Sequence, residues 1–157
     1  MISEHISYDE AVRSNTAKRK GIRNIPNPDQ LANMKRLAEN VFEPIRNHFN
    51  SPIRINSFYR SGALNKAIGG SSTSQHCLGQ AIDIDDTYGG FKNMDVVYWV
   101  HENLSFDQMI IEYPVNGAPQ WVHISYVSDF QNRKRILVAK RISGKTTYLN
   151  WDGTNHK

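Results

Sequence analysis

The sequence is poor in cysteine and in long apolar runs, and both shortages limit what the protein can be. Cys77 is the only cysteine among 157 residues, so no disulfide can form within the chain. No run of eighteen apolar residues occurs, so the sequence predicts no membrane-spanning helix. The first residues, MISEHISYDE, lack a basic stretch followed by an apolar one. We therefore expect no signal peptide, synthesis in the cytoplasm and no membrane insertion.

Internal repeats and linkers are absent as well. Hydrophobic residues make up 39% and charged residues 22%, which is typical of a globular chain. The length suits one domain, so we expect a single domain over residues 1–157, acting as a monomer. Two basic runs, Lys18–Lys20 and Arg133–Arg135, indicate solvated surface or, alternatively, attraction to a polyanion. Neither run carries interleaved aromatic residues, so no nucleic-acid partner is expected.

Helical signals fill the first third of the chain. Ser7 and Glu10 form a capping box that opens a short helix. A longer helix is predicted to begin at Pro28 and to carry one apolar stripe as far as Ile45. Because proline has no N–H to donate, Pro44 should kink this helix or start a new turn.

The rest of the chain alternates between strand and helix signals. The patterns predict strands at 53–56, 79–84, 106–113 and 120–127, helices at 62–67 and 91–103, and a hairpin of 135–142 with 146–149. We therefore expect an α+β fold, with N-terminal helices packed on a small, mainly antiparallel sheet.

The segment SQHCLGQAIDID, residues 74–85, concentrates groups that bind metals or react. Side chains alternate along a strand, so Asp83 lies on the face opposite the neighbouring isoleucines. The same argument places His123 opposite its apolar neighbours. If both strands turn their apolar faces to one core, these two side chains share the open side, and His76 can fold back beside them. Two histidines and a carboxylate form a catalytic type of zinc site, with the fourth position left for water. Such spacing also arises by chance, and alone it indicates no more than this possibility.

Other interpretations of the segment remain. Cys77 with His76 as its base would make a nucleophile pair. Adjacent residues on an extended segment point apart, however, and no orienting motif is present, so we interpret Cys77 as a small packed residue. Asp85 and Asp86 are expected in a solvated turn, or alternatively as groups that hold His76 or Asp83 in place.

Several spaced motifs resemble those of one enzyme family. Residues 74–83 match the SxHxxGxAxD pattern of the M15 zinc peptidases, which are D-alanyl-D-alanine carboxypeptidases and related phage peptidoglycan endopeptidases. WVHIS at 121–125 resembles the second metal-ligand motif of that family, and SFYRS at 57–61 resembles its SGYRS element. The resemblance covers most of residues 3–127. It implies Zn²⁺ as cofactor, with three ligands: His76, Asp83 and His123.

The resemblance also implies substrate-binding residues. Arg60 offers a rigid fork of donors, and in the family it would contact the substrate or stabilise charge on the scissile carbonyl. A structural ion pair is the alternative. Ser57 would help in substrate contact, and Ser74, beside the same site, would support the loop that carries His76.

The general base is where the sequence departs from the family pattern. Many members place an acid three residues before the last histidine ligand, and here that residue is Gln120, which cannot accept the proton. Two acids lie upstream in FDQMIIEY, where apolar residues occupy both faces, so alternation does not choose between them. A subset of the family resembles FDQxIxEY followed by WVHxSY. We expect Glu112, at the strand end, to be the base, with Asp107 as the alternative.

The resemblance implies a zinc-dependent peptidase that cleaves peptides of bacterial peptidoglycan. Without a signal peptide, a phage-type lysin that reaches the cell wall fits best, either a DD-carboxypeptidase or an endopeptidase. The missing acid at Gln120 keeps another class open: a weak or inactive zinc-bearing module that binds the cell wall or serves in a virion.

Overall fold

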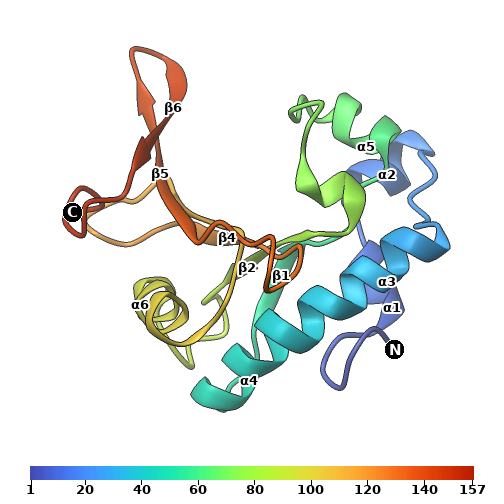
Figure 1. Ribbon diagram of the computed structural model, residues 1–157. Coiled ribbons are helices and arrows are strands. Elements are labelled where there is room, and N and C mark those ends of the chain that lie inside the picture. Colours follow the sequence, from blue (N-terminus) through green and yellow to red (C-terminus); the bar gives the residue numbers. More distant parts are fainter.

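A six-stranded sheet divides the molecule, and the longest helices cover one of its faces (Figure 1). The computed structural model describes residues 1–157. All neighbouring strands are antiparallel except β3 and β5, which are parallel. In order across the sheet, the strands are β1 (Arg54–Ser57), β2 (Ala81–Asp85), β4 (Trp121–Ser125), β3 (Gln108–Glu112), β5 (Arg135–Ile142) and β6 (Lys145–Asn150). The predicted α+β fold with a mainly antiparallel sheet is confirmed.

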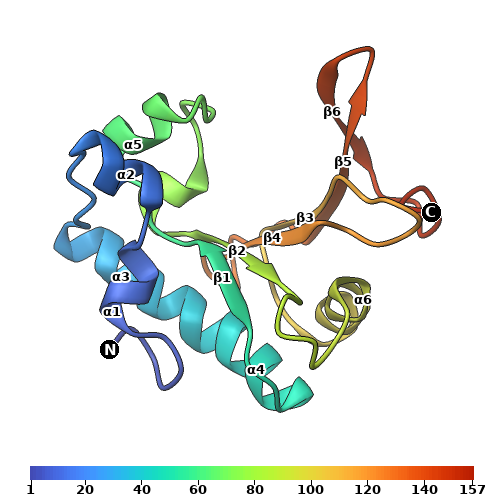
Figure 2. The same cartoon turned by 180° about the vertical axis from the view of Figure 1, so that it is seen from behind.

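The helices fall on two sides of this sheet. They are α1 (Tyr8–Val12), α2 (Asn15–Lys20), α3 (Pro28–Leu37), α4 (Glu43–Phe49), α5 (Gly62–Ala67) and α6 (Asn93–Asn103). Helices α3, α4 and α6 lie against one face, and the opposite face is flanked by α5 at one side and the β5–β6 hairpin at the other (Figures 1 and 2). No helix is long and apolar enough to cross a membrane.

The long N-terminal helix widens from α-helical to π-helical hydrogen bonding just before Pro44. Between α3 and α4, residues Ala38–Phe42 form a π-helical turn, in which the N–H of Glu43 donates to the carbonyl oxygen of Ala38. Pro44 has no N–H for the helix ladder, and a wider turn is one way to accommodate the interruption. The predicted disturbance is present, but the chain continues as a helix on both sides of it.

Helix α2 has no counterpart among the helices predicted from the sequence. Ser14 caps α2 by accepting a hydrogen bond from the N–H of Ala17, and Gly21 ends it at a φ of 63°. The basic run Lys18–Lys20 is the last turn of this helix, where cations interact favourably with the helix dipole. All three side chains are exposed, as expected for solvated surface.

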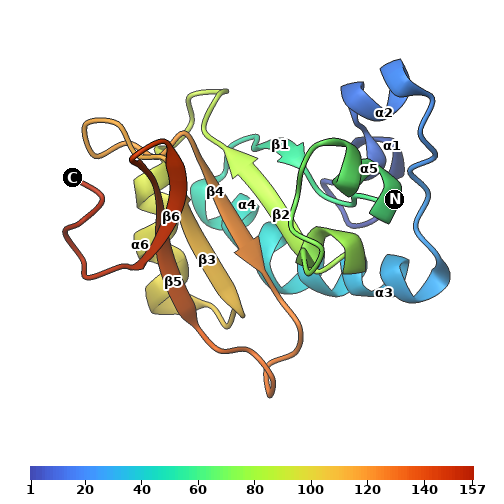
Figure 3. The same cartoon turned by 90° about the horizontal axis from the view of Figure 1, so that it is seen from above.

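Alternation along the strands separates the core from the functional face. A cluster of 25 buried residues fills the space between the helices and the sheet. Ile82 and Ile84 of β2 and Val122 and Ile124 of β4 belong to it. Seen from above, β2, β4 and β3 lie in front of α4 and α6, with their other face uncovered (Figure 3). That face carries the side chains of interest.

Candidate active site

The sheet register brings two of the predicted ligands face to face. Asp83 on β2 pairs with His123 on β4, and Ser57 on β1 pairs with Asp83 from the other side. Nδ1 of His123 lies 2.9 Å from Oδ1 of Asp83. Nε2 of His76 lies 3.2 Å from Oδ2 of the same carboxylate. One ligand atom from each of the three residues lies within 4.8 Å of the others, so the structure assembles the predicted set.

His76 reaches the sheet on a tight turn rather than on an extended segment. Gln75–Leu78 form a 3₁₀ turn, and the Ser74 hydroxyl accepts a hydrogen bond from the N–H of His76 at 3.3 Å. Gly79 ends the turn at a φ of 71°, and a Cβ there would lie 2.5 Å from the carbonyl oxygen of Gln30 in α3. The motif therefore needs glycine both for its backbone conformation and for its approach to the helix.

The tautomer of His76 follows from its hydrogen bond. Its Nδ1 lies 2.7 Å from the carbonyl oxygen of Phe58, which only accepts, so Nδ1 carries the proton and Nε2 holds a lone pair. His76 is 1% exposed, and Nε2 has no hydrogen-bond partner despite its closeness to Asp83, because neither atom has a hydrogen to donate. A buried lone pair facing a carboxylate is the arrangement that a cation satisfies. Two imidazoles and one carboxylate fit Zn²⁺.

The charges of the cluster reinforce one another. Burial by itself raises the pKa of Asp83, but the charge of the histidines in their protonated forms and their hydrogen bonds to the carboxylate outweigh it and hold that pKa far below its ordinary value. Asp83 is therefore an anion whenever the histidines are near it. An ionised carboxylate beside two imidazoles is the form that binds a metal.

Glu112 lies on the same open face, one strand further along. In the β3–β4 pairing Ile110 faces His123 and Glu112 faces Trp121, so the Glu112 side chain is a diagonal neighbour of the histidine. It is 7% exposed, and no hydrogen bond stabilises its carboxylate. Burial, with a smaller contribution from the charge of Asp83, raises the pKa of Glu112 to about 7, against the opposing effect of His123.

The carboxylate of Asp107, the alternative base, is engaged by Arg133 and Gln75. Its carboxylate accepts hydrogen bonds from Nε and Nη2 of Arg133 at 2.9 and 2.8 Å and from Nε2 of Gln75 at 2.9 Å. Arg133 holds the pKa of Asp107 below its usual value. All three residues of the run Arg133–Arg135 are exposed, as predicted for solvated surface, and Arg133 in addition pairs with the buried Asp107.

Gln120, at the position where many family members place an acid, forms no hydrogen bond with the three candidate ligands, and its backbone N–H donates to the carbonyl oxygen of Glu112. It immediately precedes β4, is exposed, and borders a hollow of about 770 Å³ together with Tyr113 and Trp121. Glu112, rather than residue 120, is thus the acid that the sheet places beside His123.

Arg60 borders the site from the β1 side. Its backbone N–H donates to the carbonyl oxygen of His76 at 3.2 Å, so the two residues are held together. Its Nε is buried without a partner, and no acidic side chain pairs with it. The structural ion pair considered as an alternative is not formed.

The remaining reactive groups have structural contacts. Cys77 is half-buried, and burial raises the pKa of its thiol, which disfavours a nucleophilic thiolate. Asp85 and Asp86 bind Asn93 at the start of α6, through its side chain and its backbone N–H respectively, and neither contacts His76.

Two supporting contacts were missed from the sequence. The Phe58 carbonyl orients His76, and the Arg133–Asp107–Gln75 chain of hydrogen bonds steadies the turn that carries it. A backbone acceptor leaves no sequence signal, and the ion pair joins residues 26 positions apart without any local pattern.

Comparison with known families matches residues 4–125 to the family described as Peptidase M15. The matched stretch contains the three candidate ligands, Arg60 and Glu112, and it ends with β4. A search of curated proteins gives no match.

Proposed function

This chain belongs to the peptidase M15 family, and from that premise we propose that it is a zinc-dependent peptidase that hydrolyses peptide bonds of bacterial peptidoglycan. The observation that carries the proposal is the convergence of His76, Asp83 and His123, with the lone pair of His76 buried and unpartnered. A structural role alone gives no reason to bury such a lone pair against a carboxylate.

The metal would be held by Nε2 of His76, a carboxylate oxygen of Asp83 and a ring nitrogen of His123. When bound, Zn²⁺ supplies a Lewis acid that polarises a peptide carbonyl and lowers the pKa of water. The hydrogen bond from His76 Nδ1 to the Phe58 carbonyl fixes the ring in the orientation that this binding needs.

Glu112 is the proposed general base. Its carboxylate accepts a proton from the attacking water as the oxygen adds to the carbonyl carbon, and the same proton then passes to the amine as the C–N bond breaks. Support comes from its place beside His123 and from a carboxylate that has no competing hydrogen bond. A positive ion beside it would lower its pKa, which keeps the base ionised near neutral pH.

Arg60 is proposed to bind the substrate and to stabilise the negative charge that develops on the carbonyl oxygen. Its guanidinium lacks an acidic partner, and its backbone N–H is hydrogen-bonded to the carbonyl oxygen of His76. Ser57, opposite Asp83 in the sheet, is proposed to assist in substrate contact, whereas Ser74 is proposed to act beside the site by capping the turn of His76.

We further propose that residues 1–157 form one functional unit, because β5 and β6 extend the sheet that carries the site. A phage-type lysin acting as a monomer on the cell wall is our proposal for its setting, and it rests on the family resemblance.

Digestion of purified peptidoglycan by the zinc-loaded protein tests this function. Mass spectrometry of the released muropeptides should show new peptide ends, and these ends would identify the cleaved bond and separate carboxypeptidase from endopeptidase. The His76→Ala protein is the matched control. The missing acid at Gln120 favours a binding module instead, and that rival would be supported by a protein that pellets with cell walls but leaves every peptide intact.

A further inference from the structure

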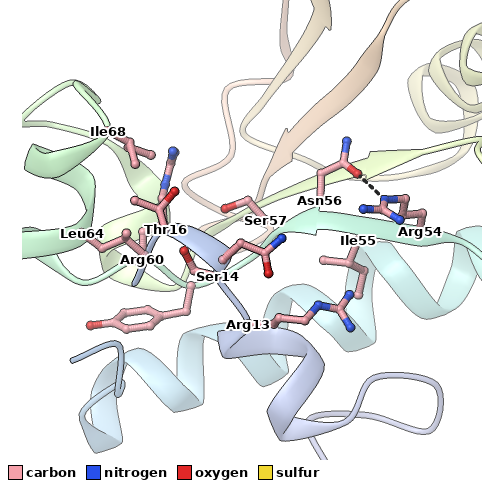
Figure 4. A pocket seen from close by; sticks show the side chains of 12 residues that line it. Arg13, Ser14, Thr16, Arg54, Ile55, Asn56, Ser57, Arg60, Leu64 and Ile68 are labelled. Carbon is pink, nitrogen blue, oxygen red and sulfur yellow. Dashed lines mark hydrogen bonds between the residues drawn. The ribbon is translucent and has the colours of Figure 1, made fainter. Parts of the chain in front are cut away.

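A polar hollow of about 290 Å³ opens beside β1 (Figure 4). Three of the twelve residues around it are arginines, and none is an aspartate or glutamate. In the close view, hydroxyl-bearing side chains lie between Arg60 on one side and Arg13 and Arg54 on the other. These side chains are Ser14, Thr16 and Ser57. The hollow is therefore rich in donors and contains no carboxylate.

One wall of the hollow is shared with the metal cluster. Ser57 pairs with Asp83 across the sheet, and the carbonyl of Phe58 accepts from His76. Arg60 then donates its backbone N–H to the carbonyl of His76. A group bound in the hollow would thus lie beside the strand that pairs with Asp83.

The other wall is fixed to the first. Its residues, Arg13 to Thr16, comprise the link between α1 and α2 and the first two residues of α2. The buried side chain of Asn24 donates to the carbonyl oxygens of Val12 and Tyr59 and accepts from the N–H of Ser61. The hollow is consequently a built feature of the fold, held on both sides by one asparagine.

None of the arginines of the hollow, Arg13, Arg54 and Arg60, forms an ion pair, although Nε of Arg54 donates to Oδ1 of Asn56 at 3.1 Å. Asp85 lies opposite Arg54 in the β1–β2 pairing, but its carboxylate accepts hydrogen bonds from Asn93 and Thr87 instead. Nε of Arg60 is buried with no partner at all. Uncompensated guanidinium groups in a concave surface attract anions, and carboxylates suit their paired donors.

We propose that this hollow is a substrate subsite in which Arg13 and Arg54 bind a free carboxylate of the peptide, next to the bond that is cut. The inference rests on the proposed peptidase function and narrows its substrate to peptides that carry such a carboxylate on the β1 side of the reaction centre. Arg60 lines the hollow and its backbone N–H donates to the carbonyl oxygen of His76, so it would couple recognition to reaction.

Paired peptides test the subsite. Two peptidoglycan stem peptides with the same scissile bond are compared, one with its free carboxylates and one with those carboxylates converted to amides. The zinc-loaded parent should cleave the acid form with a kcat/KM about tenfold higher, the order expected for one charge-assisted contact. In the Arg13→Gln/Arg54→Gln protein this ratio should fall to about 1. Arg19→Gln, an exposed arginine on α2 outside the hollow, removes the same kind of charge and should keep the parent ratio.

Calorimetry of the two peptides binding to the zinc-loaded Glu112→Gln protein tests the subsite independently of the proposed peptidase activity. A preference for the acid peptide that the double arginine change abolishes supports the subsite, even if no peptide is ever hydrolysed. Hydrolysis of both peptides at equal rates by the parent would leave the peptidase standing and overturn the subsite. Loss of the preference in Arg19→Gln as well would reduce the effect to net charge and overturn it too.

Discussion

Replacing Glu112 with glutamine should make the metal-free protein more stable while removing its catalysis. The carboxyl is almost fully buried, and burial raises its pKa from 4.5 to about 7. The unfolded chain ionises near pH 4.5 and the folded chain near pH 7, so between these values the folded state binds more protons. Stability therefore falls as pH rises through this window, and the loss is complete above pH 7.

The magnitude follows from the size of the shift. Each pKa unit corresponds to about 1.4 kcal/mol, so ionising Glu112 destabilises the metal-free fold by about 3 kcal/mol at pH 8. Glutamine cannot ionise, so the variant does not lose this folding stability as the pH rises. Relative to the parent, Glu112→Gln should gain about 2 to 3 kcal/mol in its free energy of unfolding between pH 5 and pH 8.

Urea unfolding with a chelator present, at both pH values, measures this difference. Comparing parent and variant cancels the titration of other groups, and Glu102→Gln, an exposed acid on α6, serves as the control that should show no gain. The zinc-loaded Glu112→Gln protein should meanwhile lose roughly 10²- to 10⁴-fold in hydrolysis. A variant whose stability follows pH just as the parent does would refute the assignment of a buried, destabilising carboxylate.

Substitutions at five further residues test the rest of the site. His76→Ala or His123→Ala should each lower the bound zinc measured by plasma mass spectrometry from about one per chain, and normal zinc content in both would contradict the ligand set. Arg60→Lys keeps the charge but not the planar fork, so it should retain zinc and lose on the order of 10²-fold in turnover, whereas an Arg60→Ala protein as fast as the parent would make that arginine structural. Gly79→Ala should lower the free energy of unfolding by about 2 kcal/mol or more, because of its positive φ and the nearby helix carbonyl; an unchanged urea midpoint would contradict this. Asp107→Asn should lower stability by about 1 to 3 kcal/mol yet cleave peptides at nearly the parent rate, and a folded but inactive protein would return the base to this residue.

Alternation along half-buried strands predicted that Asp83 and His123 share the open face, whereas the family resemblance named these two residues and His76 as metal ligands. Asp83 lies between two isoleucines and His123 between Val122 and Ile124, so their shared open face followed once both strands were placed on one core. The signal fails for β3, where Ile110 packs in a small cluster with Leu137 and Ala139 on the open face. With apolar residues on both faces, the position of Glu112 depended on its pairing with β4, which no local pattern encodes.

The missed elements share a different cause. Helix α2 is only six residues long, and its basic composition hid its capping serine. The 3₁₀ turn before β2 exists because Gly79 and the helix beneath it allow a tight approach, and that contact joins residues far apart in the sequence. The pairing of Asp107 with Arg133 is likewise non-local.

Because β3 pairs in parallel with β5, the strand that carries Glu112 depends on residues that come later in the chain than all the proposed catalytic groups. All the proposed catalytic groups are already present by residue 125, where the family match ends. A chain that stopped there would leave β3 as an outer strand, with the N–H and C=O groups that normally bond to residues 135–139 open to other chains. During synthesis, the strand that carries Glu112 thus gains its second neighbour only after the last strands emerge. A shortened protein cut at the end of the matched stretch should aggregate rather than report on the chemistry of the site.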